Sequence, residues 1–226
     1  MRGIKGVTFD FGGTLALGDL DKQGLRENLL GYLRSLGFSG QEAQVRKARN
    51  GMLERLMRAQ AQNREIRIED LYQGMLFRIG LHPESDVIDY IHQLYIRSFQ
   101  VELVPSAKEV LESLSAKYRL AVVSNAISDV ARHALKKFDL EEYFHSVIIS
   151  RDIGIRKPDP EIFRFALTNL GLESNEAVHV GDSLKEDVQG AKSLGMKAIW
   201  IADSGEETAV QPDYTIYSLS ELTLLL

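Results

Sequence analysis

The sequence contains no cysteine, and this absence removes whole classes of structure and chemistry. Disulfide bonds are excluded, and so are thiolate metal sites and cysteine nucleophiles. A reducing compartment is compatible with this composition, and we expect a cytoplasmic protein. No stretch is continuously apolar over the roughly 18 residues that a membrane-spanning helix needs, so we expect none. Residues 1–11 run directly into a strand pattern, so we expect no signal peptide.

An excess of positive charge is also missing. The 226 residues include 27 Lys and Arg against 32 Asp and Glu, which gives a formal net charge of −5. This balance provides no overall attraction to nucleic acid or to an anionic membrane, so we expect neither as a partner. Basic residues do concentrate in residues 46–67. We interpret them as a solvated helix face, and the alternative is a basic lip that attracts an anionic substrate or partner.

Two patterns of apolar residues divide the chain. Residues 4–11 are apolar and β-branched and end at Gly12 and Gly13, which predicts a buried strand followed by a tight turn. From about residue 19 to residue 99, apolar residues recur at helical spacing. The repeating positions are Leu25, Leu29, Leu33 and Leu36; Val45, Met52, Leu53 and Leu56; Leu71, Met75 and Ile79; and Val87, Ile91, Leu94 and Tyr95. This pattern predicts a bundle of helices inserted after the first strand.

After residues 103–106, predicted helices and strands alternate. The expected strands are 118–125, 145–150, 177–182, 197–202 and 213–216, and the expected helices are 106–117, one through Leu135, 160–170, 185–194 and a terminal one. Such alternation implies right-handed crossovers and a parallel sheet covered on both faces. We therefore predict an α/β fold, in which a Rossmann-like parallel sheet core, residues 1–16 and 100–226, carries an inserted all-helical domain, residues 17–99. Hinges between the two are expected near Leu17–Asp19 and Phe99–Val104.

Polar residues stand where the predicted strands end. Asp10 ends the first strand, Ser124 and Asn125 end the next, and Asp182 ends the strand at 177–182, while Lys157 follows the strand at 145–150. Each of them alone has an ordinary explanation as a turn, cap or solvated residue. Because ligands bind beyond the carboxyl ends of parallel strands, their common position predicts one site at one edge of the sheet.

These residue types suit phosphoryl transfer. A carboxylate such as Asp10 can attack phosphorus, which divides hydrolysis into two easier steps. Two neighbouring carboxylates repel each other, and a hard cation such as Mg²⁺ relieves that repulsion while it binds phosphate oxygens. Lys157 and Ser124 would neutralise and hydrogen-bond the remaining oxygens.

The sequence resembles the haloacid dehalogenase-like (HAD) hydrolase superfamily. The segments "DFGGT" at 10–14, "SN" at 124–125, "KPDP" at 157–160 and "GDSLKED" at 181–187 match the four motifs of that superfamily in order and spacing. The helical insertion after the first motif is similar to its C1-type cap domain. The resemblance implies a Mg²⁺-dependent phosphomonoester hydrolase that acts on a small phosphorylated metabolite through an aspartyl-phosphate intermediate.

The resemblance also implies roles for individual residues. Asp10 would be the nucleophile, and Mg²⁺ would be held by the Asp10 carboxylate, the Gly12 carbonyl and Asp182. Asp187 would brace the metal site, with Glu186 as its close rival.

The remaining motif residues would bind the phosphoryl group. Thr14 and Ser124 would contact phosphate, Asn125 would line the pocket, and Lys157 would orient both Asp10 and the phosphoryl group. Gly13 would allow the backbone turn that closes over the site.

Gly12 departs from the family pattern. Typical family phosphatases carry at that position a second aspartate, which protonates the leaving oxygen and then activates water. A metal ligand need not be lost, because the main-chain carbonyl of glycine supplies it equally well. The function in doubt is therefore acid–base assistance, which His82 or His92 of the inserted domain, or a water molecule, could provide.

Three alternatives follow from the same residues. A metal-free 2-haloacid dehalogenase also lacks the second aspartate, but Asp182 favours a metal site. A phosphomutase is disfavoured because its proton shuttle needs the missing carboxylate. A non-catalytic protein that binds a phosphorylated ligand is favoured by Gly12 and disfavoured by Asp10, Lys157 and Asp182.

Overall fold

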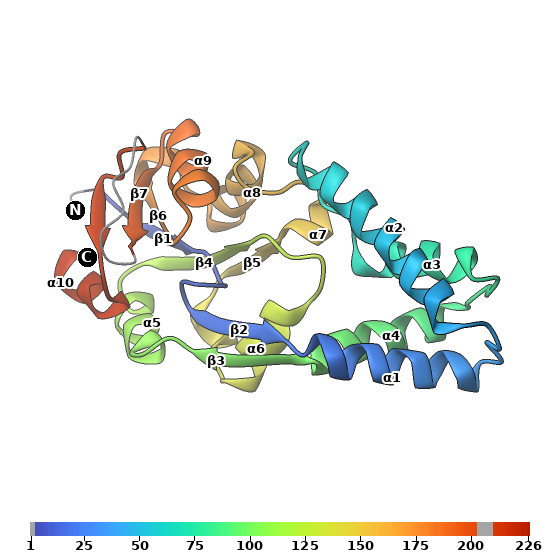
Figure 1. Ribbon diagram of the computed structural model, residues 1–226. Helices are drawn as coiled ribbons and strands as arrows, with labels where there is room; N and C mark the ends of the chain where they lie inside the picture. Colours follow the sequence, from blue (N-terminus) through green and yellow to red (C-terminus); the bar gives the residue numbers. More distant parts are fainter. Residues whose placement is uncertain (1–2, 203–209) are drawn as a thin grey trace.

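A six-stranded parallel sheet occupies one half of the computed structural model, which describes residues 3–202 and 210–226 (Figure 1). The strand order is β5-β4-β1-β6-β7-β8. The strands are β1 (Gly6–Phe9), β4 (Arg119–Ser124), β5 (Ser146–Ile149), β6 (Ala177–Gly181), β7 (Lys197–Ile201) and β8 (Tyr214–Ile216). The predicted α/β fold with a Rossmann-like parallel sheet is therefore confirmed.

Helices cover both faces of this sheet because its central strands are apolar on both sides. Along β4, Leu120 and Val122 enter the core on one face, whereas Ala121 and Val123 enter the core on the other. The first core is covered by α5 (Ala107–Ser115), α6 (Val130–Lys137) and α10 (Leu222–Leu225), and the second by α8 (Pro160–Leu170) and α9 (Gly190–Ser193). Short helical turns complete the connections: α7 (Ser150–Ile153) and the 3₁₀ turns Glu141–Tyr143, Ser174–Glu176 and Leu219–Glu221.

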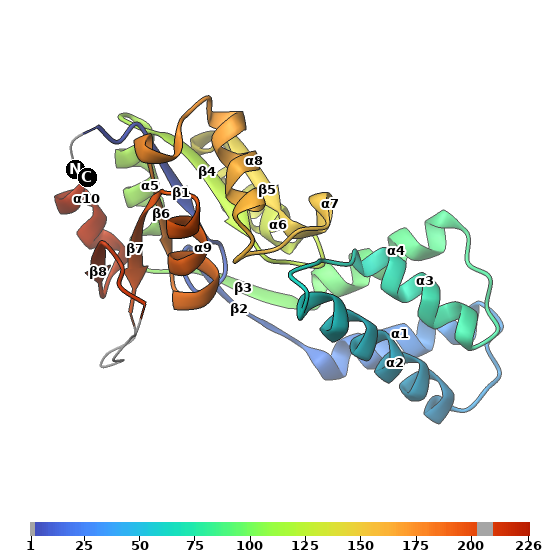
Figure 2. The ribbon, with the colours of Figure 1, turned by 90° about the horizontal axis from the view of Figure 1, so that it is seen from above.

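Four further helices form a separate cluster beside the sheet (Figure 2). They are α1 (Lys22–Ser35), α2 (Glu42–Gln60), α3 (Ile68–Arg78) and α4 (Ser85–Arg97). Their apolar faces meet in a core of their own, which includes Leu33, Leu71, Met75 and Ile91. In the part of the chain that the structure describes, no helix combines the length and the apolar character needed to cross a membrane.

A two-stranded antiparallel ribbon, not predicted from the sequence, joins these helices to the sheet. Its strands are β2 (Ala16–Leu20) and β3 (Phe99–Leu103), with Leu20 paired to Phe99 at the helical end. Both segments that we expected as hinges belong largely to this ribbon. The predicted helix at 185–194 is also different in detail, because Leu184–Gln189 form a π-helical turn before α9.

Candidate active site

The predicted site residues meet at the carboxyl ends of β1, β4 and β6. Strand β1 lies between β4 and β6, so the residues that follow these three strands are neighbours. The Asp10 amide donates to the Val180 carbonyl at 2.9 Å, which fixes the end of β1 against β6. Ser124 ends β4, and Asp182 directly follows β6.

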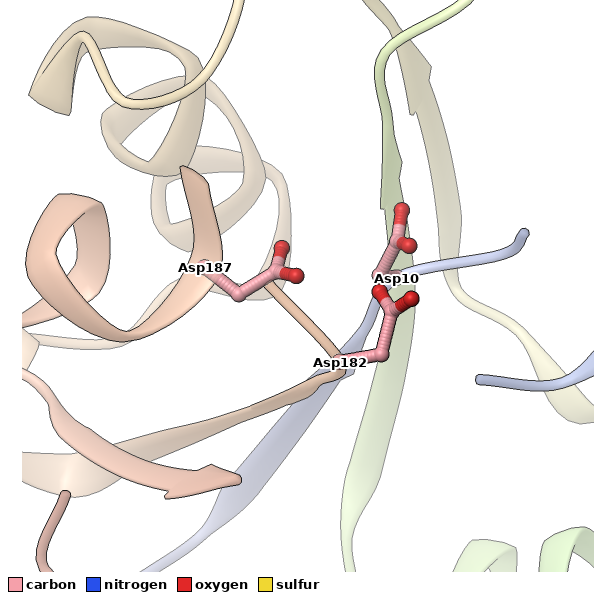
Figure 3. Close-up of side chains that lie close together, drawn as sticks. All are labelled: Asp10, Asp182 and Asp187. Carbon is pink, nitrogen blue, oxygen red and sulfur yellow. The ribbon is translucent and has the colours of Figure 1, made fainter. Parts of the chain in front are cut away.

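Three carboxylates face one another at this edge (Figure 3). One oxygen from each of Asp10, Asp182 and Asp187 lies within 4.8 Å of the others. Carboxylate oxygens are the ligands that hard divalent cations prefer, and the main-chain carbonyl of Gly12 follows Asp10 by two residues. The donor set therefore fits a divalent metal ion.

Lys157 is buried between two of these carboxylates. Its Nζ donates to Asp10 Oδ1 at 2.7 Å and to Asp187 Oδ1 at 2.6 Å. Asn125 holds the main chain of Lys157 in place: its Oδ1 accepts from the Lys157 amide at 2.9 Å, and its Nδ2 donates to the Lys157 carbonyl at 3.1 Å. Asn125 thus positions the lysine that contacts Asp10.

The charges in this cluster shift the protonation of its members. Burial raises the pKa of Asp10 to about 7, with Lys157 opposing the rise and Asp187 adding to it. Burial also acts to raise the pKa of Asp187, but the Lys157 ammonium and His179 hold that pKa below its ordinary value. Burial would lower the pKa of Lys157, and the carboxylates of Asp10 and Asp187 raise it instead. Lys157 therefore pairs with both carboxylates, and Asp10 is the carboxyl group whose ionised form a further cation would favour.

Asp187 and its rival Glu186 occupy different places. The Asp187 side chain is 1% exposed and accepts hydrogen bonds from Lys157 and from the Ser183 amide at 2.9 Å. The Glu186 side chain is 35% exposed, accepts from Asn125 Nδ2 at 2.9 Å and pairs with Arg156 at 3.0 Å. Asp187 thus lies within the carboxylate cluster and Glu186 at its rim.

His179 is a site residue that the sequence analysis missed. It lies fully buried in β6, with Nε2 3.0 Å from Asp187 Oδ1 and Nδ1 2.8 Å from Thr8 Oγ1. Burial lowers its pKa, so the neutral ring links β1 to the carboxylate cluster. The signal was a lone imidazole in the otherwise apolar strand "AVHVG".

A cavity of about 490 Å³ opens over the cluster, a size typical of small-molecule sites. Asp10, Gly12, Ser124, Asn125 and Asp182 line it from the sheet side. Leu56, Gln60 and Tyr95 line it from the helical region, and Leu17 and Val101 from the ribbon. Thr14 is fully buried and is not among the lining residues, and its Oγ1 has no hydrogen-bond partner within the described chain.

The histidines that we considered as proton donors lie elsewhere. Among the described residues, no histidine lines this cavity. His92 is buried beside Glu69, with Nδ1 3.0 Å from Oε1, and His82 packs its ring against Phe77. Neither side chain replaces the carboxylate missing at Gly12.

The two glycines of the first turn differ in what they would tolerate. A Cβ at Gly12 would meet no atom within 4 Å, and the backbone there is not left-handed. Gly13 has a φ of 83°, and a Cβ on it would collide with the Asp182 carboxylate. Gly13 is therefore required by the turn, whereas Gly12 is not.

Comparison with known proteins gives a family and several relatives. The model of the family described as haloacid dehalogenase-like hydrolase matches residues 7–201. A phosphoserine phosphatase of Thermus thermophilus is 37% identical over 126 residues, covering 54% of this chain and 50% of the relative. A glyceraldehyde 3-phosphate phosphatase of Pyrococcus furiosus is 26% identical over 100% of this chain and 93% of the relative. Several of the curated matches, the first among them, span only about half of the relative's length.

Solved structures resemble the whole chain. A 2-haloacid dehalogenase from Pseudomonas syringae is 27% identical with a TM-score of 0.73, and each chain is covered to 98%. A HAD phosphatase from Thermococcus onnurineus is 30% identical with a TM-score of 0.64, covering 98% of this chain and 97% of the relative. Both kinds of hydrolase therefore share this architecture.

Proposed function

The chain belongs to the haloacid dehalogenase-like hydrolase family, and from this premise we propose that it is a Mg²⁺-dependent phosphomonoester hydrolase acting on a small phosphorylated metabolite. The observation that carries the proposal is the Asp10–Asp182–Asp187 cluster with Lys157 at the base of an open cavity. The relatives named as phosphatases support the same reaction.

The residues that would hold Mg²⁺ are Asp10, Asp182 and the Gly12 carbonyl, with Asp187 bracing the site. Bound there, the cation would offset the negative charge of the carboxylates and of the phosphate oxygens. The need for such an offset is visible in the charges, because Lys157 pairs with Asp10 and Asp187, whereas no ion pair is found for Asp182 among the described residues.

In the proposed first step, Asp10 attacks phosphorus. Lys157 holds Oδ1, and within the described chain no hydrogen bond falls on Oδ2, which is free to form the new P–O bond. The bond from phosphorus to the leaving oxygen breaks, and that oxygen keeps the electron pair. Lys157 and Ser124 would stabilise the charge on the transferred group. Water then attacks the aspartyl phosphate, which releases phosphate and restores the Asp10 carboxylate.

Among the described residues that line the cavity, neither Tyr95 nor Glu65 is suited to act as an efficient general acid. Tyr95 lines the cavity, but burial raises its pKa to about 12, which makes it a poor proton donor near neutral pH. Glu65 also lines the cavity, but its Oε2 already accepts from Ser150 Oγ at 2.9 Å. The enzyme should therefore prefer leaving groups that depart without help from a proton.

The helices α1–α4 act, in this proposal, as a cap domain within residues 17–99. They have their own core and contribute Leu56, Gln60 and Tyr95 to the wall of the catalytic cavity. Movement of the cap on the β2–β3 ribbon would admit substrate and then exclude water.

Hydrolysis of an aryl phosphate tests the proposal. We expect activity with Mg²⁺, none in EDTA, and none after Asp10→Asn. The charge-matched control Asp89→Asn, at an exposed position of α4, should be fully active. Circular dichroism should show that Asp10→Asn is folded. Full activity of Asp10→Asn would refute the covalent mechanism.

A dehalogenase is the second candidate, and the structural likeness to a 2-haloacid dehalogenase favours it. In that reaction Asp10 would attack carbon and no metal would be needed. Release of halide from a 2-haloacid in the presence of EDTA would establish this activity in place of phosphate hydrolysis.

A further inference from the structure

A second cavity, which the proposed chemistry does not use, runs between α1 and α2. Its volume is about 630 Å³, within the range of small-molecule sites. It shares the side chains of Leu56, Tyr95 and Ile127 with the catalytic cavity. We call this second cavity the cap groove; these three residues border both cavities.

The cap groove exists because of how the helices pack. Helix α4 packs against α1 and α3, and α3 packs against α2, which leaves the side between α1 and α2 open. Apolar side chains form much of the lining. Those from the helical core are Leu29, Val45, Met52, Ile68, Leu71 and Tyr72. An apolar ligand would therefore bury hydrophobic surface on both sides.

The cap groove also carries positive charge. Among the described residues, its lining includes Lys22, Arg26, Arg46 and Arg49, together with Glu42, which pairs with Arg26 at 3.6 Å. The Nε of Arg49 is buried and has no hydrogen-bond partner within the described chain. A buried donor without an acceptor is costly, so an oxygen of a ligand would complete this site.

The charged residues that line the catalytic cavity are negative, whereas most of those that line the cap groove are positive. The helical region and the ribbon give the catalytic cavity apolar residues and Gln60, and its other charged lining residues, Glu65 and Glu186, are acidic. A second anionic group on the substrate, close to its phosphate, would be repelled by these carboxylates. Arg49 precedes Leu56 by two helical turns, about 10.5 Å along α2. An anionic or polar group further along the substrate could therefore bind Arg49.

We propose, resting on the phosphatase function above, that the substrate is a phosphomonoester whose leaving group carries an extended apolar chain. Its phosphate lies at Asp10, its apolar chain passes Leu56 and Tyr95 into the cap groove, and an acceptor oxygen on its far part meets Arg49. Small, strongly polar esters such as sugar phosphates then bind without using the groove.

The test compares ethyl, butyl, hexyl and octyl phosphate. Each methylene that enters the groove should raise kcat/KM by up to about fourfold. Leu53→Glu places a carboxylate one turn after Arg49, where it can pair with Arg49 and make the groove wall polar. This variant should lose the increase with chain length and keep the rate on ethyl phosphate. Met57→Glu, on the same helix but outside both cavities, should behave like the wild type.

Binding separates this inference from the phosphatase proposal. Calorimetry on Asp10→Asn protein with Mg²⁺ should show octyl phosphate binding more tightly than inorganic phosphate, with the difference lost in Leu53→Glu. That result supports the groove even if no ester is hydrolysed, in which case the phosphatase proposal alone fails. Hydrolysis of ethyl phosphate with no gain in rate or affinity along the series would overturn the inference. Arg49→Met should remove any preference for an ω-carboxylated octyl phosphate over octyl phosphate, and an unchanged preference would overturn the role of Arg49.

Discussion

Restoring a carboxylate at Gly12 tests whether this enzyme lacks its general acid. In the structure, a side chain at this position points into open space, and the backbone is not left-handed. Gly12→Asp should therefore fold and keep the main-chain carbonyl that we assign to the metal. The neighbouring Gly13 offers no such room, so Gly13→Ala should disturb the turn and the Asp182 carboxylate.

The expected gain follows from the value of a positioned proton donor. General acid–base assistance contributes about 100- to 10,000-fold, or about 3–5 kcal/mol of barrier. An alkoxide leaving group needs that proton, whereas a nitrophenolate or an acyl phosphate departs without it. Gly12→Asp should therefore speed alkyl phosphates toward that range and change activated substrates little.

The assay is single-turnover transfer to Asp10 for a series of leaving groups. We expect the logarithm of the rate to fall steeply with leaving-group pKa in the wild type and less steeply in Gly12→Asp. Gly12→Asn, which has nearly the same size and no acidic proton, is the matched control and should keep the steep slope. A shallow slope in the wild type would refute the reasoning, because another group would already supply the proton.

Three further predictions follow from the same contacts. Lys157→Met leaves two buried carboxylates without their cation. Urea unfolding of the metal-free protein should therefore show a free energy of unfolding that is lower by about 3–5 kcal/mol. The control Lys192→Met, which breaks an exposed ion pair, should lower it by about 0–1 kcal/mol. Burial acts to raise the pKa of Glu69, but the His92 hydrogen bond and Arg151 lower it to about 2. The stability that the ionised Glu69 contributes is thus present above its unfolded-state pKa of 4.5 and is lost as the pH falls toward 2. Glu69→Gln should therefore lose less stability in acid than the wild type. An unchanged dependence of stability on pH would contradict this. Replacing residues 21–98 by a short turn between Leu20 and Phe99, which pair in the ribbon, should leave a folded core that still binds phosphate. Its selectivity among large substrates should fall. An unchanged ranking of substrates would show that the cap does not choose the substrate.

The sheet could be predicted from the sequence because its strands are short apolar runs with helices between them. The ribbon could not, since β2 and β3 contain polar residues and pair segments that lie far apart in the chain. Neither "ALGDL" nor "FQVEL" shows its partner in its own composition, and pairing of this kind depends on tertiary contacts.

The position of the carboxylate cluster was predictable for a geometric reason. Parallel strands place their carboxyl ends at one edge, so Asp10, Ser124 and Asp182 had to be neighbours once the sheet order was set. The role of His179 depends on a contact with Asp187 across a turn, which strand periodicity does not reveal.

The orientation of the helical residues was not predictable. Helical spacing shows which face of α4 is buried, but not which residues of that face point to the catalytic cavity. Tyr95 lines that cavity, whereas His92 lies against Glu69. Similarly, the basic segment 46–67 is divided: Arg46 and Arg49 line the cap groove, while Arg67 pairs with Glu69 at 3.5 Å.

Trapping the phosphoenzyme tests the central claim most directly. The protein is mixed with an acyl phosphate and Mg²⁺, quenched in acid within one turnover, digested, and analysed by mass spectrometry for a phosphorylated peptide. We predict one phosphoryl group on Asp10, absent when EDTA replaces Mg²⁺ and absent in Asp10→Asn. Phosphate release without any label on Asp10, or with the label on another residue, would contradict the account.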